Sequence, residues 1–254
     1  MNLLREYSLS GYTVREFDTL DSTNNYLKRV ADTAPDGTVA TALTQTGGKG
    51  SRGRSFYSEG GGLYFSVLLK RSIPVSQAHL LTPAAAVAVA EGLEKIGAKN
   101  AGIKWVNDIY IGGRKVCGIL TETQISPDGQ TLAHAIIGIG VNLYEPPNGF
   151  PDDIKNKAGA VFKSASPDLR ERCLGSILEA LSEHLAALHE RKFLSAYRER
   201  SVLLGKEVEI SSGDIERDMP ERGTAVEIDD DCRLIVRTPN GMRTLNSGEV
   251  SVKI

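Results

Sequence analysis

The sequence predicts an α+β protein that combines a large mixed domain with a small β domain. Up to residue 204, strand-like segments alternate with helices whose apolar residues recur every three to four positions. After Gly205, only short strands follow, separated by Gly, Asp-Asp or Pro-Asn-Gly, which is typical of a small β-barrel. We therefore expect one domain over residues 1–204 and a second over residues 205–254, a division that the chain length of 254 residues allows.

The first part of the chain contains three predicted strands and one short helix. Ser22 or Thr23 is the expected N-cap of that helix, because a short hydroxyl side chain there can accept an orphan backbone N–H. In chain order we expect a strand over 12–20, a helix over 21–32, and strands over 37–45 and 61–70.

The middle of the chain contains a predicted hairpin. Gly112 and Gly113 separate two strand-like segments, and both glycines can take the positive φ of a two-residue turn. The remaining predicted elements are a helix over 78–97 ended by Gly97, the hairpin over 101–124, a strand over 131–144, an irregular proline-rich segment over 145–162, and helices over 167–191 and 193–204.

The composition excludes several classes of protein. Thirty basic residues balance 32 acidic ones for a net charge of -2, so the basic excess typical of nucleic-acid binders is missing. The three cysteines are far apart, without CxxC or HxxxH spacing, which indicates reduced thiols and no structural zinc. The N-terminus does not read as a signal peptide, and no apolar run approaches the ~20 residues that span a bilayer. We expect a cytoplasmic protein that binds neither nucleic acid nor membranes.

The segment TQTGGKGSRGR, residues 44–54, is the first candidate binding site. Its glycines expose backbone N–H groups, and Lys49, Arg52 and Arg54 add positive charge, which suits a phosphate or carboxylate. It is not a P-loop, because that motif requires Gly at position 43 and Ser or Thr at position 50. A flexible solvated loop explains the composition equally well.

Asp108 and Lys115 form the second candidate site. If the strands turn at the glycine pair without a bulge, Asp108 lies opposite Cys117 and shares a face with Lys115, roughly 7–8 Å away by backbone position. Asn107 and Gly118 then point to the other face, unless a bulge intervenes. The carboxylate could bind Mg²⁺ and the ammonium a phosphate or carboxylate. An ordinary cross-strand ion pair is the competing interpretation.

The segment DSTNN, residues 21–25, is polar where a strand gives way to a helix. Capping of the helix explains it, and hydrogen bonding to a polar ligand at the helix N-terminus is compatible with that role. No Ser-His-Asp or Cys-His arrangement can be assembled from the sequence. We therefore expect catalysis by positioning and electrostatic stabilisation of two anionic reactants.

Five segments, in this order, resemble those of biotin–protein ligases over essentially the whole chain. They are DSTNNYLK (21–28), TQTGGKGSRGR (44–54), GGLYFSVLL (61–69), IKWVNDIYIGGRKVCGILTE (103–122) and GIGVNL (138–143). The resemblance implies a class II synthetase-like catalytic domain, with a mixed, largely antiparallel sheet and helices on one face, and a C-terminal SH3-like barrel. It also implies the monofunctional type without an N-terminal DNA-binding domain, and a possible homodimer through sheet edges.

The same resemblance implies a two-step reaction. Biotin and MgATP give biotinyl-5′-AMP and pyrophosphate, and a lysine of a biotin carboxyl carrier protein domain then attacks this mixed anhydride. Lys115 is implied to stabilise the carboxylate and α-phosphate, and Asp108 to bind Mg²⁺ and orient the amine. The implied biotin-binding residues are Ser22, Thr23, Asn24, Gln45, Lys49, Gly50, Ser51, Lys115 and Gly118. The implied nucleotide-binding residues are Arg52, Arg54, Asn107 and Asn142.

The sequence departs from the family pattern at two places. The family loop usually reads GRGRxGR, whereas here Lys49 replaces one arginine and Ser51 replaces another that helps hold the adenylate. We expect weaker retention of the adenylate, or compensation by Arg52. Val106 stands where proline is common, and valine suits a strand.

Two other functions compete with this interpretation. A lipoate or octanoate ligase shares the catalytic fold, but the glycine-rich loop, the KWxND segment and the C-terminal barrel favour biotin. A non-catalytic biotin-binding regulator would not need both Asp108 and Lys115.

Overall fold

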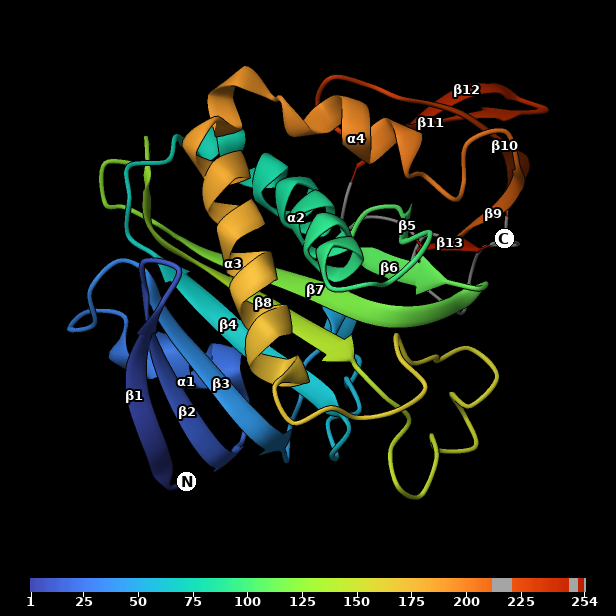
Figure 1. Cartoon of the computed structure of the whole chain (residues 1–254). Helices are drawn as coiled ribbons and strands as arrows, with labels where there is room; N and C mark the ends of the chain where they lie inside the picture. The colour runs from blue at the N-terminus through green and yellow to red at the C-terminus, as the bar shows by residue number, and fades with distance from the viewer. Residues whose placement is uncertain (212–220, 247–250, 254) are drawn as a thin grey trace.

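The computed structural model describes residues 1–211, 221–246 and 251–253. An eight-stranded sheet forms the larger part of the molecule and a five-stranded sheet the C-terminal part (Figure 1). In sheet order the large sheet contains β1 (Leu3–Leu9), β2 (Tyr12–Leu20), β3 (Thr38–Gln45), β4 (Gly62–Leu69), β8 (Leu132–Asn142), β7 (Arg114–Ile125), β6 (Asp108–Ile111) and β5 (Gly102–Lys104). Only β2 and β3 pair in parallel, which confirms a mixed, largely antiparallel sheet.

One face of this sheet carries α2 (Leu81–Lys95), α3 (Leu169–Ala186) and α4 (Phe193–Glu199), as Figure 1 shows. The small side chains of α2, residues 84–90, are completely buried between the sheet and α3. At Gly92 an added Cβ would lie 2.8 Å from Ile177, so glycine is required where α2 packs against α3 at this point. This face holds the main core of the molecule.

The prediction that the helices occupy one face is wrong for α1 (Thr23–Val30). This helix packs on the opposite face, where Leu27 joins a separate buried cluster with Phe17, Leu68 and Ile136. Ser22 is the N-cap residue as predicted, but its side chain makes no capping hydrogen bond.

Three further boundaries differ from the prediction. Strand β1 was not predicted; it joins β2 through a turn in which Ser10 and Gly11 have positive φ. The predicted helix over 78–97 begins only at Leu81, after the 3₁₀ helix η2 (Val75–Leu80). The helix predicted over 193–204 ends at Glu199, because residues 200–202 instead form backbone hydrogen bonds with Ile103 of β5.

The predicted hairpin over 101–124 is confirmed, with Gly112 and Gly113 at φ values of 58° and 77°. Its first strand is interrupted, however, because residues 105–107 form a turn between β5 and β6. Val106 lies in this turn, after a cis peptide bond, and not in a strand as expected.

The C-terminal part is an antiparallel sheet of β12 (Gly241–Leu245), β11 (Leu234–Thr238), β10 (Glu221–Ile228), β9 (Glu207–Ser211) and β13 (Ser251–Lys253), in that order. The predicted β structure is therefore confirmed. Its closure into an SH3-like barrel is not, because the edge strands β12 and β13 form no ladder with each other in the described residues. Parts of the predicted strands at residues 212–220 and 247–250 lie outside the described residues.

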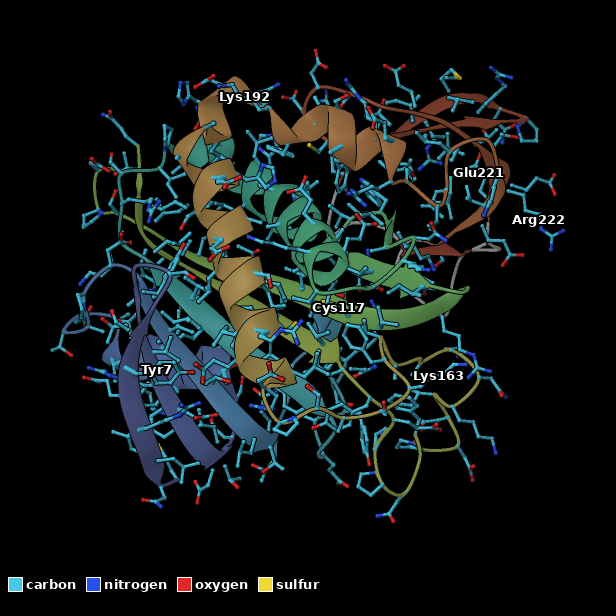
Figure 2. The ribbon with its side chains drawn as sticks, viewed as in Figure 1. Tyr7, Cys117, Lys163, Lys192, Glu221 and Arg222 are labelled. Carbon is cyan, nitrogen blue, oxygen red and sulfur yellow. The ribbon has the colours of Figure 1, made fainter. Side chains whose placement is uncertain are left out.

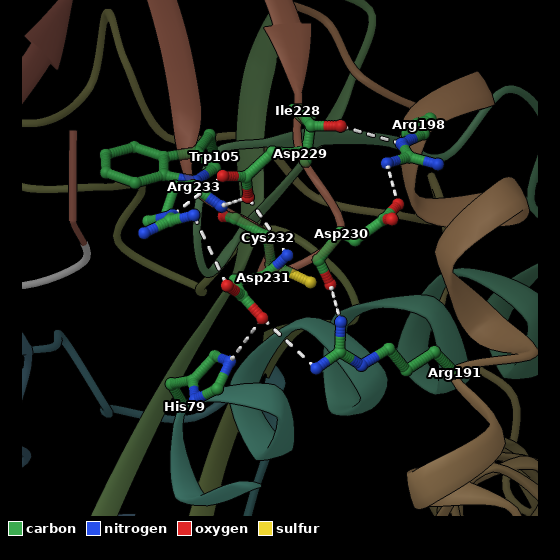
Figure 3. A network of polar contacts seen from close by, with 10 residues as sticks. All are labelled: His79, Trp105, Arg191, Arg198, Ile228, Asp229, Asp230, Asp231, Cys232 and Arg233. Atoms are coloured by element: carbon green, nitrogen blue, oxygen red, sulfur yellow. Dashed lines mark hydrogen bonds and ion pairs between the residues drawn. The ribbon is translucent and has the colours of Figure 1, made fainter. Parts of the chain in front are cut away.

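The turn at residues 229–233 holds this small sheet against the larger part of the molecule (Figure 3). The indole Nε1 of Trp105 donates to the carbonyl oxygen of Cys232 at 2.9 Å. Arg191 donates to the Asp230 carbonyl, and Arg198 to the Ile228 carbonyl. Side chains of β9, β10 and β11 belong to the same buried cluster as α2 and α3, so the core is continuous across both parts.

All three cysteines are free and buried, as predicted. Cys117, labelled in Figure 2, lies on the face of β7 that packs in the main core. Burial raises the pKa of the Cys173 thiol to about 12. Within the described residues, no helix is long and apolar enough to cross a membrane.

Candidate active site

Small residues leave space on the sheet face that carries α1. Along β7 and β8, bulky residues such as Ile119 and Ile139 point into the core, whereas Gly118 and Gly140 point the other way and pair with each other. Gly138, two residues before Gly140, shares that face. The sequence GIGVN of β8 therefore provides a floor without side chains.

A small cavity of about 30 Å³ lies on this floor, at the N-terminus of α1. Its lining residues are Ser22, Thr23, Asn24, Gln45, Lys49, Phe56, Gly118, Leu120, Gly138, Ile139 and Gly140.

Buried polar side chains form a network beside this first cavity. The backbone N–H of Thr23 donates to Gln45 Oε1 at 2.8 Å, and Gln45 Nε2 donates to Ser58 Oγ at 2.9 Å. Ser66 Oγ lies 2.7 Å from Thr23 Oγ1 and 2.5 Å from Asn24 Oδ1. The cavity can therefore bind a ligand group that has both hydrogen-bond donors and hydrogen-bond acceptors.

A second cavity, of about 80 Å³, adjoins the first. The two share Lys49, Phe56, Gly118 and Leu120 in their lining. The other lining residues of the second cavity are Gly50, Ser51, Arg54, Ser55, Asn107, Lys115 and Ile119. A neutral head and an anionic tail of one extended ligand could thus occupy adjacent spaces.

Asp108 and Lys115 share a face, as predicted, but in a different register. Asp108 pairs with Gly118 and not with Cys117, because a bulge interrupts the ladder between β6 and β7. Because of this bulge, Gly118 lies on the same face as Asp108 and Lys115, and not on the opposite face that a regular hairpin predicts. A Cβ added at Gly118 would lie 3.2 Å from Lys115 Nζ. Lys115 Nζ lies 2.6 Å from Asp108 Oδ1, which is buried and lacks a hydrogen bond of good geometry within the described structure.

The glycine-rich loop covers the second cavity. Arg54 folds back onto Ser51, with Nη2 donating to Ser51 Oγ at 3.0 Å. Arg52 lies in the 3₁₀ turn η1 (Ser51–Gly53) with φ of 59°, and it is not among the residues lining the two cavities. An added Cβ at Gly48 would lie 2.4 Å from the Phe56 carbonyl oxygen, so glycine is needed for the loop to close over the sheet.

Asn142 lies next to the second cavity and not in the lining of either. Its Nδ2 donates to the carbonyl of Gly159 at 3.1 Å, and the N–H of Gly159 donates to the carbonyl of Lys115. Asn107 Nδ2 donates to the Ile119 carbonyl at 2.7 Å. The irregular segment over 145–162 is thereby held beside Lys115.

The structure therefore brings together most of the predicted residues at α1, β3, the loop and the hairpin. Arg52, Asn142 and Asp108 line neither cavity, although Asp108 contacts Lys115. Sequence reasoning missed Phe56, Ser58, Ser66 and Glu122. The alternation along β4 and β7 could have indicated Ser66 and Glu122, since both are polar residues facing the same side as glycines. Phe56 gave no such signal, because a loop residue has no periodicity.

The donor set suits a metal that arrives with a nucleotide. Among residues 1–211, 221–246 and 251–253, no three His, Cys, Asp or Glu side chains lie together as a metal site. Asp108 offers a carboxylate beside the second cavity. Mg²⁺ commonly binds through one or two carboxylates together with substrate phosphates, so the residues present fit it.

Comparisons with known proteins agree with this geometry. Residues 16–142 match the Biotin/lipoate A/B protein ligase family, and residues 203–253 match the Biotin protein ligase C terminal domain. The chain belongs to the biotin/lipoate protein ligase family. Among members of this family, the bifunctional ligase/repressor BirA of Bacillus subtilis is 32% identical over 92% of this chain and 72% of its own length. The biotin–[acetyl-CoA-carboxylase] ligase of Paracoccus denitrificans is 30% identical over 91% of this chain and 96% of its own.

Solved structures of family members have the same fold. The biotin protein ligase of Aquifex aeolicus, determined with biotin and ATP, superposes with a TM-score of 0.76 at 28% identity, covering 94% of this chain and 98% of that one. The C-terminal match begins within two residues of the predicted boundary at 204/205, although the domain division itself stays a prediction.

Proposed function

We propose that this protein is a biotin–protein ligase that activates biotin with MgATP and transfers it to a lysine of a biotin carboxyl carrier protein domain. The observation that carries the proposal is the pair of adjoining cavities, one lined by buried hydrogen-bonding groups and the next by cations. The relatives named as biotin ligases support the same reaction.

The first cavity would bind the bicyclic head of biotin. Thr23, Asn24 and Gln45 can exchange hydrogen bonds with its ureido group, while Leu120, Phe56 and the glycine floor contact its rings. Gly118 leaves room for the valeryl chain to pass toward Lys115.

The second cavity would hold the reacting atoms. A biotin carboxylate oxygen attacks the α-phosphorus of ATP, the bond from that phosphorus to the bridging oxygen breaks, and pyrophosphate leaves. Lys115, Lys49 and Arg54 supply positive charge around the carboxylate and the phosphoryl group, which lowers the barrier by stabilising charge at phosphorus. Asp108 would bind the Mg²⁺ that accompanies the nucleotide, and Asn107, Asn142 and Arg52 would lie on the nucleotide side.

Closure of the glycine-rich loop would protect the adenylate from water. The carrier lysine then attacks the carbonyl carbon, the C–O bond to the phosphate breaks, and AMP leaves. Asp108, in contact with Lys115, would also orient the attacking amine after the acid has been activated.

Lipoate is the alternative substrate, because the family includes lipoate ligases. A dithiolane ring has neither N–H donors nor a carbonyl oxygen, so it would leave the polar groups of the first cavity unpaired. The match of residues 203–253 to a biotin protein ligase domain also favours biotin.

The test follows the mass of a purified biotin carrier domain mixed with the protein, MgATP and biotin. We expect a gain of one biotin on one lysine, and no gain when ATP is omitted. An unchanged carrier mass together with tight biotin binding would favour a non-catalytic regulator.

Lys115→Met tests the role of the Lys115 charge in the same assay. Since the methionine keeps most of the side-chain length but removes the charge, adenylate formation should fall about 100-fold or more, in line with the loss of one transition-state contact. Biotin affinity should change much less. Lys155→Met, at an exposed lysine paired with Asp152, should leave the rate unchanged.

A further inference from the structure

Glu122 on β7 is connected to the first cavity by a chain of hydrogen bonds that its sequence position did not reveal. Its Oε2 accepts Asn24 Nδ2 at 2.8 Å, and its Oε1 lies 2.6 Å from Lys28 Nζ. Asn24 Oδ1 lies 2.5 Å from Ser66 Oγ, which lies 2.7 Å from Thr23 Oγ1. Asn24, Ser66 and Thr23 are all buried, so water does not substitute for these contacts.

At the Glu122 end of this hydrogen-bond network, the donors and acceptors are fixed. Burial works against ionisation of Glu122, but hydrogen bonds from Lys28 and Asn24 outweigh it and lower the pKa of the carboxyl group. At neutral pH the carboxylate therefore only accepts hydrogen bonds. The carbonyl of Leu120, 3.4 Å from Asn24 Nδ2, also only accepts. Both acceptors require the amide of Asn24 to point its NH₂ outward and its oxygen toward Ser66.

The orientation of the Asn24 amide determines whether Thr23 Oγ1 accepts a hydrogen bond from Ser66. Ser66 has one hydroxyl hydrogen and two oxygens near it, Asn24 Oδ1 at 2.5 Å and Thr23 Oγ1 at 2.7 Å. An amide oxygen held against Ser66 requires that hydrogen, so Thr23 Oγ1 does not receive it. The 2.7 Å contact then takes its hydrogen from Thr23, which donates to Ser66 Oγ, while Gln45 Oε1 lies farther away at 3.2 Å. Thr23 Oγ1 is therefore left with lone pairs at the cavity.

We propose that Glu122 is a specificity-determining positioning residue: it orients Asn24 and Ser66 so that Thr23 Oγ1 is a hydrogen-bond acceptor for an N–H group of the ligand. This inference rests on the proposed function, in which that N–H belongs to the ureido ring of biotin. A purely structural role for Glu122, as the partner that ties Lys28 of α1 to β7, is the competing explanation.

Glu122→Gln tests the proposal, because glutamine can donate to Asn24 and lets its amide reverse. Ser66 then gives its hydrogen to Thr23 Oγ1, which fills one of its two lone pairs and turns the Thr23 hydrogen away from Ser66, toward Gln45 or the cavity. The measurement is the calorimetric Kd for biotin and for two isosteric cyclic carbamates, each with oxygen in place of one ureido N–H. For at least one carbamate, the wild-type protein should prefer biotin by about 100-fold or more, since rejection of a ligand that lacks a required donor is steep. In Glu122→Gln that preference should fall at least about tenfold.

A double variant separates orientation from general damage. Ser66→Ala removes the competing hydrogen, so Glu122→Gln combined with Ser66→Ala should regain the preference for biotin. Lys28→Met, which breaks the ion pair but keeps the carboxylate, should retain it. If Glu122→Gln does not fold, Asn24→Ala carries the test, because it also frees the Ser66 hydrogen and should lower the preference.

Equal weakening of biotin and both carbamates in Glu122→Gln, with an unchanged ratio, would overturn this inference and leave the ligase function intact. Failure of the wild-type protein to bind biotin at all would overturn both.

Discussion

Ser51 is a residue at which the sequence resemblance led us to expect an arginine. In the structure Ser51 lines the second cavity and accepts a hydrogen bond from Arg54, so it occupies a place that a longer cation would fill. Ser51→Arg should slow release of the adenylate about tenfold, because a charged hydrogen bond to phosphate contributes about 1.5–3 kcal/mol. The release rate is measured by trapping free adenylate in a stopped reaction. An unchanged rate would mean that Arg52 or Arg54 already supplies this contact.

Gly138 gives a second prediction at the residue scale. An added Cβ would lie 2.2 Å from Asn24 Oδ1, and that amide is enclosed by Ser66 and Glu122. Gly138→Ala should destabilise the fold by about 1–3 kcal/mol, typical of overpacking, and weaken biotin binding. Denaturant unfolding and calorimetry measure the two effects. Gly175→Ala in α3, where the new Cβ would make an ordinary 3.7 Å contact with Leu9, should not destabilise the protein.

At this scale, the residues with a local signature were predictable. Lys115, the loop cations and the polar segment at residues 22–24 stand out as charge or polarity beside glycines and strand ends. Phe56 and Ser58 did not, because they contribute through a loop that returns to the sheet, and a loop conformation follows from tertiary contacts that no local pattern encodes.

Among the elements, the β5–β6 turn gives the clearest prediction. Trp105 donates its indole N–H to the buried carbonyl of Cys232, joining this turn to the C-terminal sheet. Trp105→Phe removes the donor and keeps most of the packing. It should cost about 1–3 kcal/mol, the usual penalty for an unpaired buried carbonyl. The free energy of unfolding in urea measures the loss. An unchanged free energy of unfolding in Trp105→Phe would exclude a stabilising role for this hydrogen bond.

Helices and strands could be predicted where the hydrophobic periodicity was strong, but their boundaries could not. Helix α2 and strands β3, β4 and β8 are apolar and buried, so their sequences match their structures closely. The bulge in β7 was invisible, because a one-residue shift of register leaves no compositional trace. The face occupied by α1 also escaped prediction, since the side of a sheet on which a short helix packs depends on the chain crossing and not on the helix alone.

For the whole molecule, the ion pair between Glu94 of α2 and Arg200 links the helical layer to the segment that pairs with β5. Arg200 donates to both oxygens of Glu94, at 2.9 and 2.8 Å, and these bonds lower the pKa of Glu94 although burial opposes the shift. A carboxyl group with a lowered folded pKa stabilises the fold above its unfolded pKa, and this contribution disappears as the pH falls through the folded pKa.

Glu94→Gln should therefore lower stability at neutral pH by up to about 1 kcal/mol, the range of partly exposed pairs. The difference from wild type should vanish in acid. Thermal unfolding at a series of pH values measures it, with Glu145→Gln, at an exposed position, as the control. A difference that persists undiminished in acid would show that charge is not the source.

The overall architecture follows from the sequence at a coarse level. Two parts, a mixed sheet and a β-rich C-terminus, were expected and are present, while a ladder between β12 and β13 that would close the C-terminal sheet is not among the pairings of the described residues.

The most direct test of the central claim is a competition between two acids. The protein is incubated with MgATP and equal concentrations of biotin and lipoate, and the acyl-adenylates are identified by mass spectrometry. The account predicts biotinyl adenylate in large excess, because only biotin pairs with the hydrogen-bonding groups of the first cavity. A predominance of lipoyl adenylate, or no adenylate of either acid, would contradict it.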